Sequence, residues 1–180
     1  MLGVRTFGAY EKRNPVLSVM SSILGGGMSS RLFTKLREDL GAAYYVHSSN
    51  NNFTDHGFFE IAAGVSNDKV GIVISEILKE CARLCDTLVS SEELEKTKEY
   101  LVGNMKLELE SSDAWANYYG GQEVLRKKIL SSEEIEKKIR TVSAKDIQKI
   151  AKEIFVDKNL NLALIGPFES EKEFSSKLTF

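Results

Sequence analysis

The stretch at residues 24–46, LGGGMSSRLFTKLREDLGAAYYV, carries the most specific pattern in the chain. Its glycine triplet, residues 25–27, follows an apolar run with helical spacing and predicts the end of a helix. Ser29 or Ser30 can cap a second, short helix, and a β-type segment follows from Tyr44. The triplet is not a phosphate-binding loop, because no GxxxxGKS/T pattern is present.

Arg37 and Tyr44 lie seven residues apart in this stretch, with Gly41 between them. If Arg37 ends the short helix and Tyr44 begins the strand, Gly41 can turn the chain so that both side chains point into one space. Both side chains donate hydrogen bonds, and two convergent donors suit a carbonyl oxygen on which negative charge develops. Each also has an ordinary interpretation, with Arg37 as a solvated helix residue and Tyr44 and Tyr45 as strand aromatics.

The string GGGMSSRLF, followed by LRE, Gly41 and Tyr44, resembles the C-terminal half of the pitrilysin/insulinase family of zinc peptidases, the inverzincins. It closely resembles bacterial members related to mitochondrial processing peptidase. A weaker resemblance runs from residues 2–3 to residues 165–167 and so covers nearly the whole chain. In that family an arginine and a tyrosine at this spacing reach across to the metal site in the other half. The resemblance therefore implies catalytic and substrate-binding roles for Arg37 and Tyr44.

The zinc-binding motif of that family is missing from this chain. Family enzymes hold zinc with HxxEH on a helix and a downstream glutamate. The only histidines here are His47 and His56, and neither stands in such a pattern. The resemblance thus implies that zinc is bound by a missing half and that this chain binds none. The chain is then either a piece of a longer peptidase or the non-metal member of a two-chain enzyme.

Two pairs of residues could be interpreted as metal ligands, but another interpretation is favoured for each pair. If a hairpin turn is centred near residues 51–52, His47 and His56 lie opposite each other, yet no third ligand is evident, so a polar pair near the loop is the favoured interpretation. Cys81 and Cys85 lie four residues apart on an expected helix. No further cysteine could complete a thiolate site, so we expect both to pack in the core.

The composition is that of an ordinary globular domain. The 180 residues are 42% hydrophobic and 28% charged, and a net charge of -2 gives no reason to expect nucleic acid or an anionic membrane as a partner. No transmembrane segment or signal peptide is visible, so a cytoplasmic location is expected, although a chain that starts mid-protein would lose such a signal. We expect one domain over residues 1–168 and a frayed tail over 169–180.

The order of the expected elements predicts an α+β fold, with helices packed on one face of a mostly antiparallel sheet. Strands are expected at residues 2–7, 44–48, 57–65 and 160–165. Between them, apolar residues with helical spacing and three S-x-x-E/D patterns, beginning at Ser90, Ser131 and Ser143, predict helices. The aromatic cluster Trp115, Tyr118 and Tyr119 could line a peptide-binding wall, but core packing is favoured.

Together these observations predict the substrate-binding and transition-state-stabilising half of a zinc-dependent endopeptidase that acts on peptides or unfolded polypeptides. Its partner would be a zinc-bearing N-terminal half or a partner subunit, and a homodimer is one arrangement of such halves. The alternative is a non-catalytic scaffold or assembly subunit on the same fold, similar to the core proteins of respiratory complexes. A stand-alone peptide-binding domain is a third possibility, and fold alone does not decide among them.

Overall fold

A four-stranded antiparallel sheet forms one layer of the protein. The computed structural model describes residues 1–125, 128–170 and 172–180. The strands are β1 (Leu2–Thr6), β2 (Ala43–Asn52), β3 (Gly57–Val65) and β4 (Asn161–Leu162). Their order in the sheet is β2-β3-β1-β4, so β2 is an edge strand, and every neighbouring pair is antiparallel.

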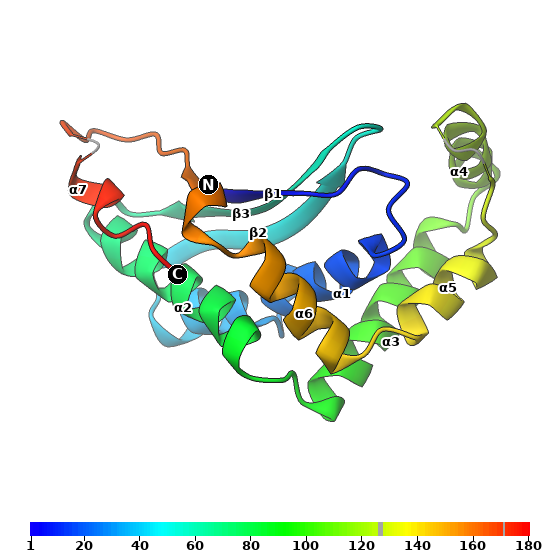
Figure 1. The fold of residues 1–180 in the computed structure, drawn as a ribbon, viewed down its shortest axis with the longest axis horizontal. Helices are drawn as coiled ribbons and strands as arrows, with labels where there is room; N and C mark the ends of the chain where they lie inside the picture. Colours follow the sequence, from blue (N-terminus) through cyan, green and yellow to red (C-terminus); the bar gives the residue numbers. More distant parts are fainter. Residues whose placement is uncertain (126–127, 171) are drawn as a thin grey trace.

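Helices make up the second layer. The α-helices are α1 (Asn14–Gly25), α2 (Val70–Asp86), α3 (Ser91–Glu108), α4 (Ser112–Leu125), α5 (Ser132–Arg140), α6 (Ala144–Ile154) and α7 (Lys172–Ser175). A π-helix, η1 (Phe33–Asp39), and two 3₁₀ turns, η2 (Asn67–Lys69) and η3 (Asp157–Asn159), complete the described elements. Figure 1 shows α1, α2 and α6 on one side of the sheet, with α3 and α5 beyond them and α4 standing apart. The predicted α+β class, with helices on one face of an antiparallel sheet, is confirmed. None of the described helices is long and apolar enough to cross a membrane.

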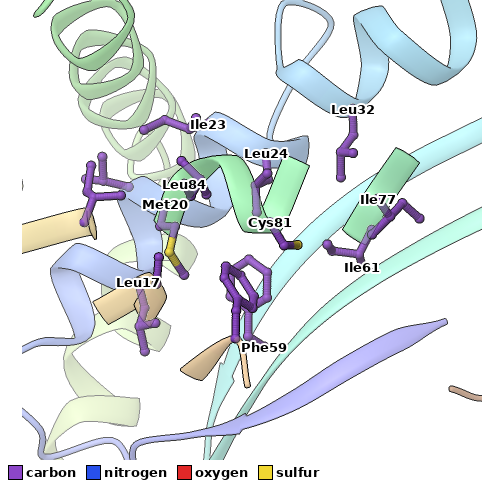
Figure 2. Packing of buried hydrophobic residues seen from close by; sticks show 14 of the residues in the cluster. Leu17, Met20, Ile23, Leu24, Leu32, Phe59, Ile61, Ile77, Cys81 and Leu84 are labelled. Atoms are coloured by element: carbon purple, nitrogen blue, oxygen red, sulfur yellow. The ribbon is translucent and has the colours of Figure 1, made fainter. Parts of the chain in front are cut away.

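The core lies between the sheet and the helices α1 and α2. Phe59 of β3 is 1% exposed, and Figure 2 shows side chains of both helices converging on it. Antiparallel pairing sets Val4 of β1 opposite Phe59, so these neighbours share the core face. Phe155, directly after α6, meets the Phe59 ring edge-on at 5.7 Å. The residues labelled in Figure 2 are Leu17, Met20, Ile23, Leu24, Leu32, Phe59, Ile61, Ile77, Cys81 and Leu84.

The glycine triplet has a packing role that its position at a helix end did not reveal. Gly25 is the last residue of α1, and a Cβ there would lie 2.6 Å from the backbone nitrogen of Ser48 in β2. Beside it the Ser21 hydroxyl donates to the Ser48 carbonyl at 2.9 Å, and the Ser48 hydroxyl donates to the Ser21 carbonyl at 2.6 Å. These reciprocal bonds satisfy two buried hydroxyls and hold α1 against the edge strand.

All three predicted serine caps start helices. Ser131 and Ser143 form complete capping boxes with Glu134 and Asp146. Ser90 accepts from the Glu93 amide at 3.1 Å, but the Glu93 carboxylate is bound to an arginine, Arg31, instead of turning back to the cap.

The C-terminal residues are part of the folded body, contrary to the expected frayed tail. Phe174 in α7 is only 4% exposed, and Phe180 packs against the core with its ring 5.4 Å from that of Phe155. The Asp157 carboxylate accepts hydrogen bonds from the Phe180 amide at 2.9 Å and from the Thr179 hydroxyl at 3.1 Å. The small number of apolar residues in this segment is therefore enough to anchor it, because each finds a partner in the core.

We expect Phe174→Ala to lower the free energy of unfolding by about 3 kcal/mol, since truncating a buried phenylalanine removes apolar contacts and leaves a cavity. Urea denaturation followed by circular dichroism measures the change. Ile165→Ala is the matched control, because Ile165 is fully exposed and its truncation should change stability by less than about 0.5 kcal/mol. Equal, small effects of both substitutions would mean that the tail frays in solution.

Candidate functional site

Arg37 and Tyr44 lie on either side of one turn, as predicted. Arg37 is in the last turn of η1, where its guanidinium carbon lies 5.0 Å from the centre of the Phe33 ring. Tyr44 is the second residue of β2, and its side chain is 87% exposed. Neither side chain forms a hydrogen bond with any residue that the structure describes, so both donors are free to bind another molecule.

The turn itself is built by the end of the π-helix and Gly41. The amides of Leu40 and Ala42 donate to carbonyl oxygens five and six residues back, at 3.2 and 2.7 Å, which gives the wide last turn of a π-helix. Gly41 follows with φ of +50°, the left-handed conformation that glycine adopts without strain. Lys69 fixes the turn from outside, since its ammonium donates to the Gly41 carbonyl at 2.9 Å. The predicted glycine turn between Arg37 and Tyr44 is therefore present.

A β-bulge at the start of β2 turns both tyrosines to solvent. The pairing with β3 shifts register between Ala43 and Tyr45, so simple alternation of faces does not hold here. Tyr45 is 49% exposed, lies over Gly64 so closely that a Cβ there would collide with the ring, and stacks on His47 at 6.0 Å. Neighbouring residues of a regular strand point to opposite faces, but the bulge breaks this two-residue period, and Tyr44 and Tyr45 are both exposed.

A partly buried ion-pair cluster positions η1 on the helical layer. Arg31, just before η1, donates two hydrogen bonds to the Glu93 carboxylate of α3, each at 2.7 Å. Its third nitrogen lies 3.7 Å from a carboxylate oxygen of Glu80 in α2. The hydrogen bonds to Glu93 raise the pKa of Arg31 above its ordinary value, and the side chain is 15% exposed. Sequence reasoning missed this cluster, since no local pattern links residues that lie 49 and 62 positions apart.

A large cleft elsewhere in the protein does not include the two donors. It has a volume of about 580 Å³ and lies between the glycine loop and the first turns of α3. Hydroxyl groups line much of it, among them those of Ser29, Ser90 and Tyr100, and a Cβ at Gly27 would lie 3.2 Å from the Tyr100 ring. The candidate site at Arg37 and Tyr44 lies on the surface, and both side chains are exposed.

The histidine pair does not form a metal site. The hairpin turn lies at residues 53–56, where the Phe53 amide donates to the His56 carbonyl at 2.8 Å, and not near residues 51–52. His47 consequently pairs with Ala62, while His56 stacks on Phe53 at 4.8 Å and bonds to Asp55. In the described part of the chain, no three His, Cys, Asp or Glu side chains come together as metal ligands.

The remaining candidates divide between the core and the surface. Cys81 is 2% exposed and Cys85 is half-buried, and burial raises the pKa of both thiols, which favours their protonated form. Core packing of Cys81 is thereby confirmed. The aromatic cluster differs from expectation: Trp115, Tyr118 and Tyr119 contact one another at 5.2–5.8 Å on α4, outside the core clusters.

Comparison with known proteins identifies the family. The family model described as "Peptidase M16 inactive domain" matches residues 1–101, more than half of the chain. The chain belongs to this family. The resemblance to zinc peptidases read from residues 24–46 is confirmed by this match.

Curated relatives of this M16 domain carry the names of zinc proteases. An uncharacterized zinc protease of Bacillus subtilis is 32% identical over 92% of this chain, which spans 40% of that relative. An uncharacterized zinc protease of Mycobacterium leprae is 31% identical over 99% of this chain, again spanning 40% of the relative. The M16 domain therefore corresponds to about 40% of the length of these relatives.

Solved structures show the same fold. A protease from Helicobacter pylori superposes with a TM-score of 0.79 at 24% identity, over 88% of this chain and 38% of its own. A chain of complex III from Candida albicans also gives a TM-score of 0.79, at 20% identity, over 88% of this chain and 40% of its own. One fold thus occurs both in a protease and in a chain of complex III.

A matched pair of glycine substitutions tests the turn of the M16 domain. Gly41→Ala should lower the free energy of unfolding by about 1–2 kcal/mol, because alanine is strained at positive φ. Gly103→Ala in α3 should raise it by up to about 1 kcal/mol, because alanine favours the helix. Among the described residues, no neighbouring atom lies within 4 Å of a Cβ at either glycine, so the two sites differ in backbone conformation. Thermal unfolding measures both, and two changes of the same sign would contradict a left-handed Gly41.

Proposed function

We propose that this M16 domain is the substrate-binding and transition-state-stabilising half of a zinc-dependent endopeptidase acting on peptides or unfolded polypeptides. The observation that carries the proposal is the pair of free donors, Arg37 and Tyr44, on the two sides of the Gly41 turn. The names of the relatives support it, as does their length, which leaves room for a further half that binds the zinc.

Each donor would have a distinct task on the substrate. The planar guanidinium of Arg37 would bind backbone carbonyl oxygens of the polypeptide. The hydroxyl of Tyr44 would donate to the carbonyl oxygen of the cleaved bond as negative charge develops on it. Neither side chain is a nucleophile or a general base, and the described residues contain no zinc ligand set. The domain would therefore supply orientation and charge stabilisation, while the other half supplies the metal.

Local rigidity supports this role, because a donor stabilises a transition state best when it is already in position. The ammonium of Lys69 holds the Gly41 carbonyl, and Arg31 ties the start of the same segment to α2 and α3. The bulge next to Ala43 gives Tyr44 its exposure.

A non-catalytic assembly subunit is the second candidate. It is favoured by the likeness to a chain of Candida albicans complex III and by the family description, which calls the domain inactive. In such a subunit, substitutions of Arg37 and Tyr44 would leave every activity of the assembly unchanged. The two candidates are therefore separated by the variants described below.

The isolated chain should hydrolyse no peptide and hold no stoichiometric zinc, because it has neither HxxEH nor a described cluster of three metal ligands. Metal analysis after dialysis and a fluorogenic peptide assay measure the two properties. One firmly bound zinc per chain, or cleavage abolished by a chelator, would contradict the proposed division of labour between the halves.

Tyr44→Phe, in the enzyme that contains the zinc-bearing half, should lower kcat about 10²–10³-fold with little change in KM. The substitution removes one donor aimed at charge present only in the transition state. Arg37→Lys should raise KM and lower kcat together, because lysine keeps the charge but loses the planar fork. Steady-state kinetics on one peptide substrate gives both constants.

Tyr45→Phe is the matched control, since the bulge exposes it beside Tyr44 while its ring rests on Gly64. Its kcat should remain within about threefold of the parent enzyme, because no charge-stabilising role is assigned to its hydroxyl. A large loss in Tyr45→Phe with a normal Tyr44→Phe would move the oxyanion role to Tyr45. Normal kinetics in all three variants would favour the assembly subunit.

A further inference from the structure

The helices α1, α2 and α6 cover one face of the sheet, and we call the opposite face the outer face. Phe59 and Ile61 of β3 point toward these helices and belong to the core cluster. The residues next to them point the other way, because side chains alternate between the two faces of a strand. On β2 and β3 the outer face therefore carries Tyr45, His47, Ser49 and Asn51, which pair with Gly64, Ala62, Glu60 and Phe58.

A partly buried carboxylate is held in place on the outer face. One oxygen of Glu60, Oε1, accepts hydrogen bonds from the Ser49 hydroxyl at 2.8 Å and from the Asn51 amide at 3.2 Å. The Asn51 amide also donates to the Ser49 hydroxyl oxygen at 3.1 Å, so the three side chains form one network. The other oxygen, Oε2, has no hydrogen bond with any residue that the structure describes. On the neighbouring strand β1, Glu60 pairs with Gly3, which has no side chain to cover it.

No ion pair neutralises this carboxylate among the residues that the structure describes. Arg5 lies on the outer face of β1, two residues beyond Gly3, but it is exposed and forms no ion pair with Glu60. The Met1 ammonium donates to the Ala163 carbonyl at 2.8 Å. Burial lowers the pKa of this ammonium, whereas the nearby Glu60 raises it and so favours the charged form. Glu60 therefore attracts positive charge without being paired to one.

We propose that Glu60 is a specificity-determining residue that binds a lysine or arginine side chain of an extended polypeptide substrate; the cleavage of that substrate rests on the proposed function. A carboxylate with a free oxygen accepts charge-assisted hydrogen bonds from either cation. Ser49 and Asn51 hold it in position before the substrate binds. Continuity also identifies the occupant, because the outer face begins at Tyr45, directly after the proposed donor Tyr44.

The geometry of β2 gives the position of the cation along the substrate. Ser49, which holds Glu60, follows Tyr44 by five residues, and this separation corresponds to roughly 16 Å along a strand. An extended polypeptide covers the same length in about five residues. Glu60 should therefore select a cation about five residues from the cleaved bond, on one side of that bond.

Binding can be measured on this chain alone through its two histidines. His47 lies on the outer face two residues before Ser49, whereas His56 lies at the hairpin turn. With ¹⁵N-histidine labelling, an unstructured peptide of glycine and serine with one central lysine should shift the ring signals of His47 in NMR spectra and leave those of His56 unchanged. The same peptide with glutamine in place of lysine should bind about fivefold more weakly, which is the effect of one exposed ion pair.

Glu60→Gln should abolish the preference for the lysine peptide, because glutamine keeps an oxygen for Ser49 and Asn51 but carries no charge. Glu60→Lys should reverse the preference, so that a glutamate peptide binds more tightly than the lysine peptide. Glu92→Gln is the matched control, since Glu92 is an exposed carboxylate on α3, and this variant should keep the preference. Circular dichroism checks the fold of each variant. An equal preference in the parent chain and in Glu60→Gln, or no shift of His47 with any peptide, overturns the proposal.

Kinetics with the zinc-bearing half test the predicted position. When one lysine is moved along an otherwise neutral peptide, kcat/KM should rise about fivefold where the lysine lies about five residues from the cleaved bond, and Glu60→Gln should remove this rise. A preference only next to the cleaved bond, or none, overturns the proposal. Normal kinetics of Tyr44→Phe would contradict the proposed function and leave the lysine-dependent shift of His47 intact. Loss of the lysine preference would remove the role of Glu60 and leave the effect of Tyr44→Phe unchanged.

Discussion

The close contact between α1 and the edge strand β2 is the constraint on which the rest of the site depends. Gly25 lets the helix end against the Ser48 backbone at a distance that leaves no room for a Cβ, and Ser21 closes the contact with two reciprocal hydrogen bonds. Because α1 and β2 are fixed together, the distance between the end of α1 and the start of β2 is also fixed. The segment that joins them must complete its π-helix and its turn within this distance. Arg31 holds that segment on α2 and α3, so the positions of Arg37 and Tyr44 follow from buried contacts and not from their own interactions.

The sequence predicted the fold class because alternation and helical spacing follow from which side of each element faces the core. It misplaced the hairpin turn because the asparagines at residues 50–52 favour turns by themselves, yet here they continue the ladder opposite β3. The sequence did not predict that the C-terminal tail packs on the body. Phe174 and Phe180 show no helical or strand spacing, and they are covered by residues that lie far away in the sequence. The aromatic residues of α4 have the spacing of a buried helix face, which favoured core packing, yet the core clusters of the described residues do not include them.

The site was predicted as far as local sequence determines it. Gly41 and the seven-residue spacing place Arg37 and Tyr44 on one turn, and the structure has that turn. A bulge adds one residue to one strand without any composition signal, so the exposure of Tyr45 could not be read from alternation. What the two donors do on a substrate stays a prediction, because their target would come from outside this chain.

The bulge in β2 has a consequence for solubility. An edge strand offers a row of unpaired backbone groups that can recruit a strand from another molecule, and irregular pairing is one way in which proteins blunt such an edge. The extra residue that carries Tyr44 outward also interrupts the regular backbone that a foreign strand would need. Deleting one tyrosine from the pair would restore an even ladder, and the protein would then become more prone to aggregate as well as losing its outward-facing phenol.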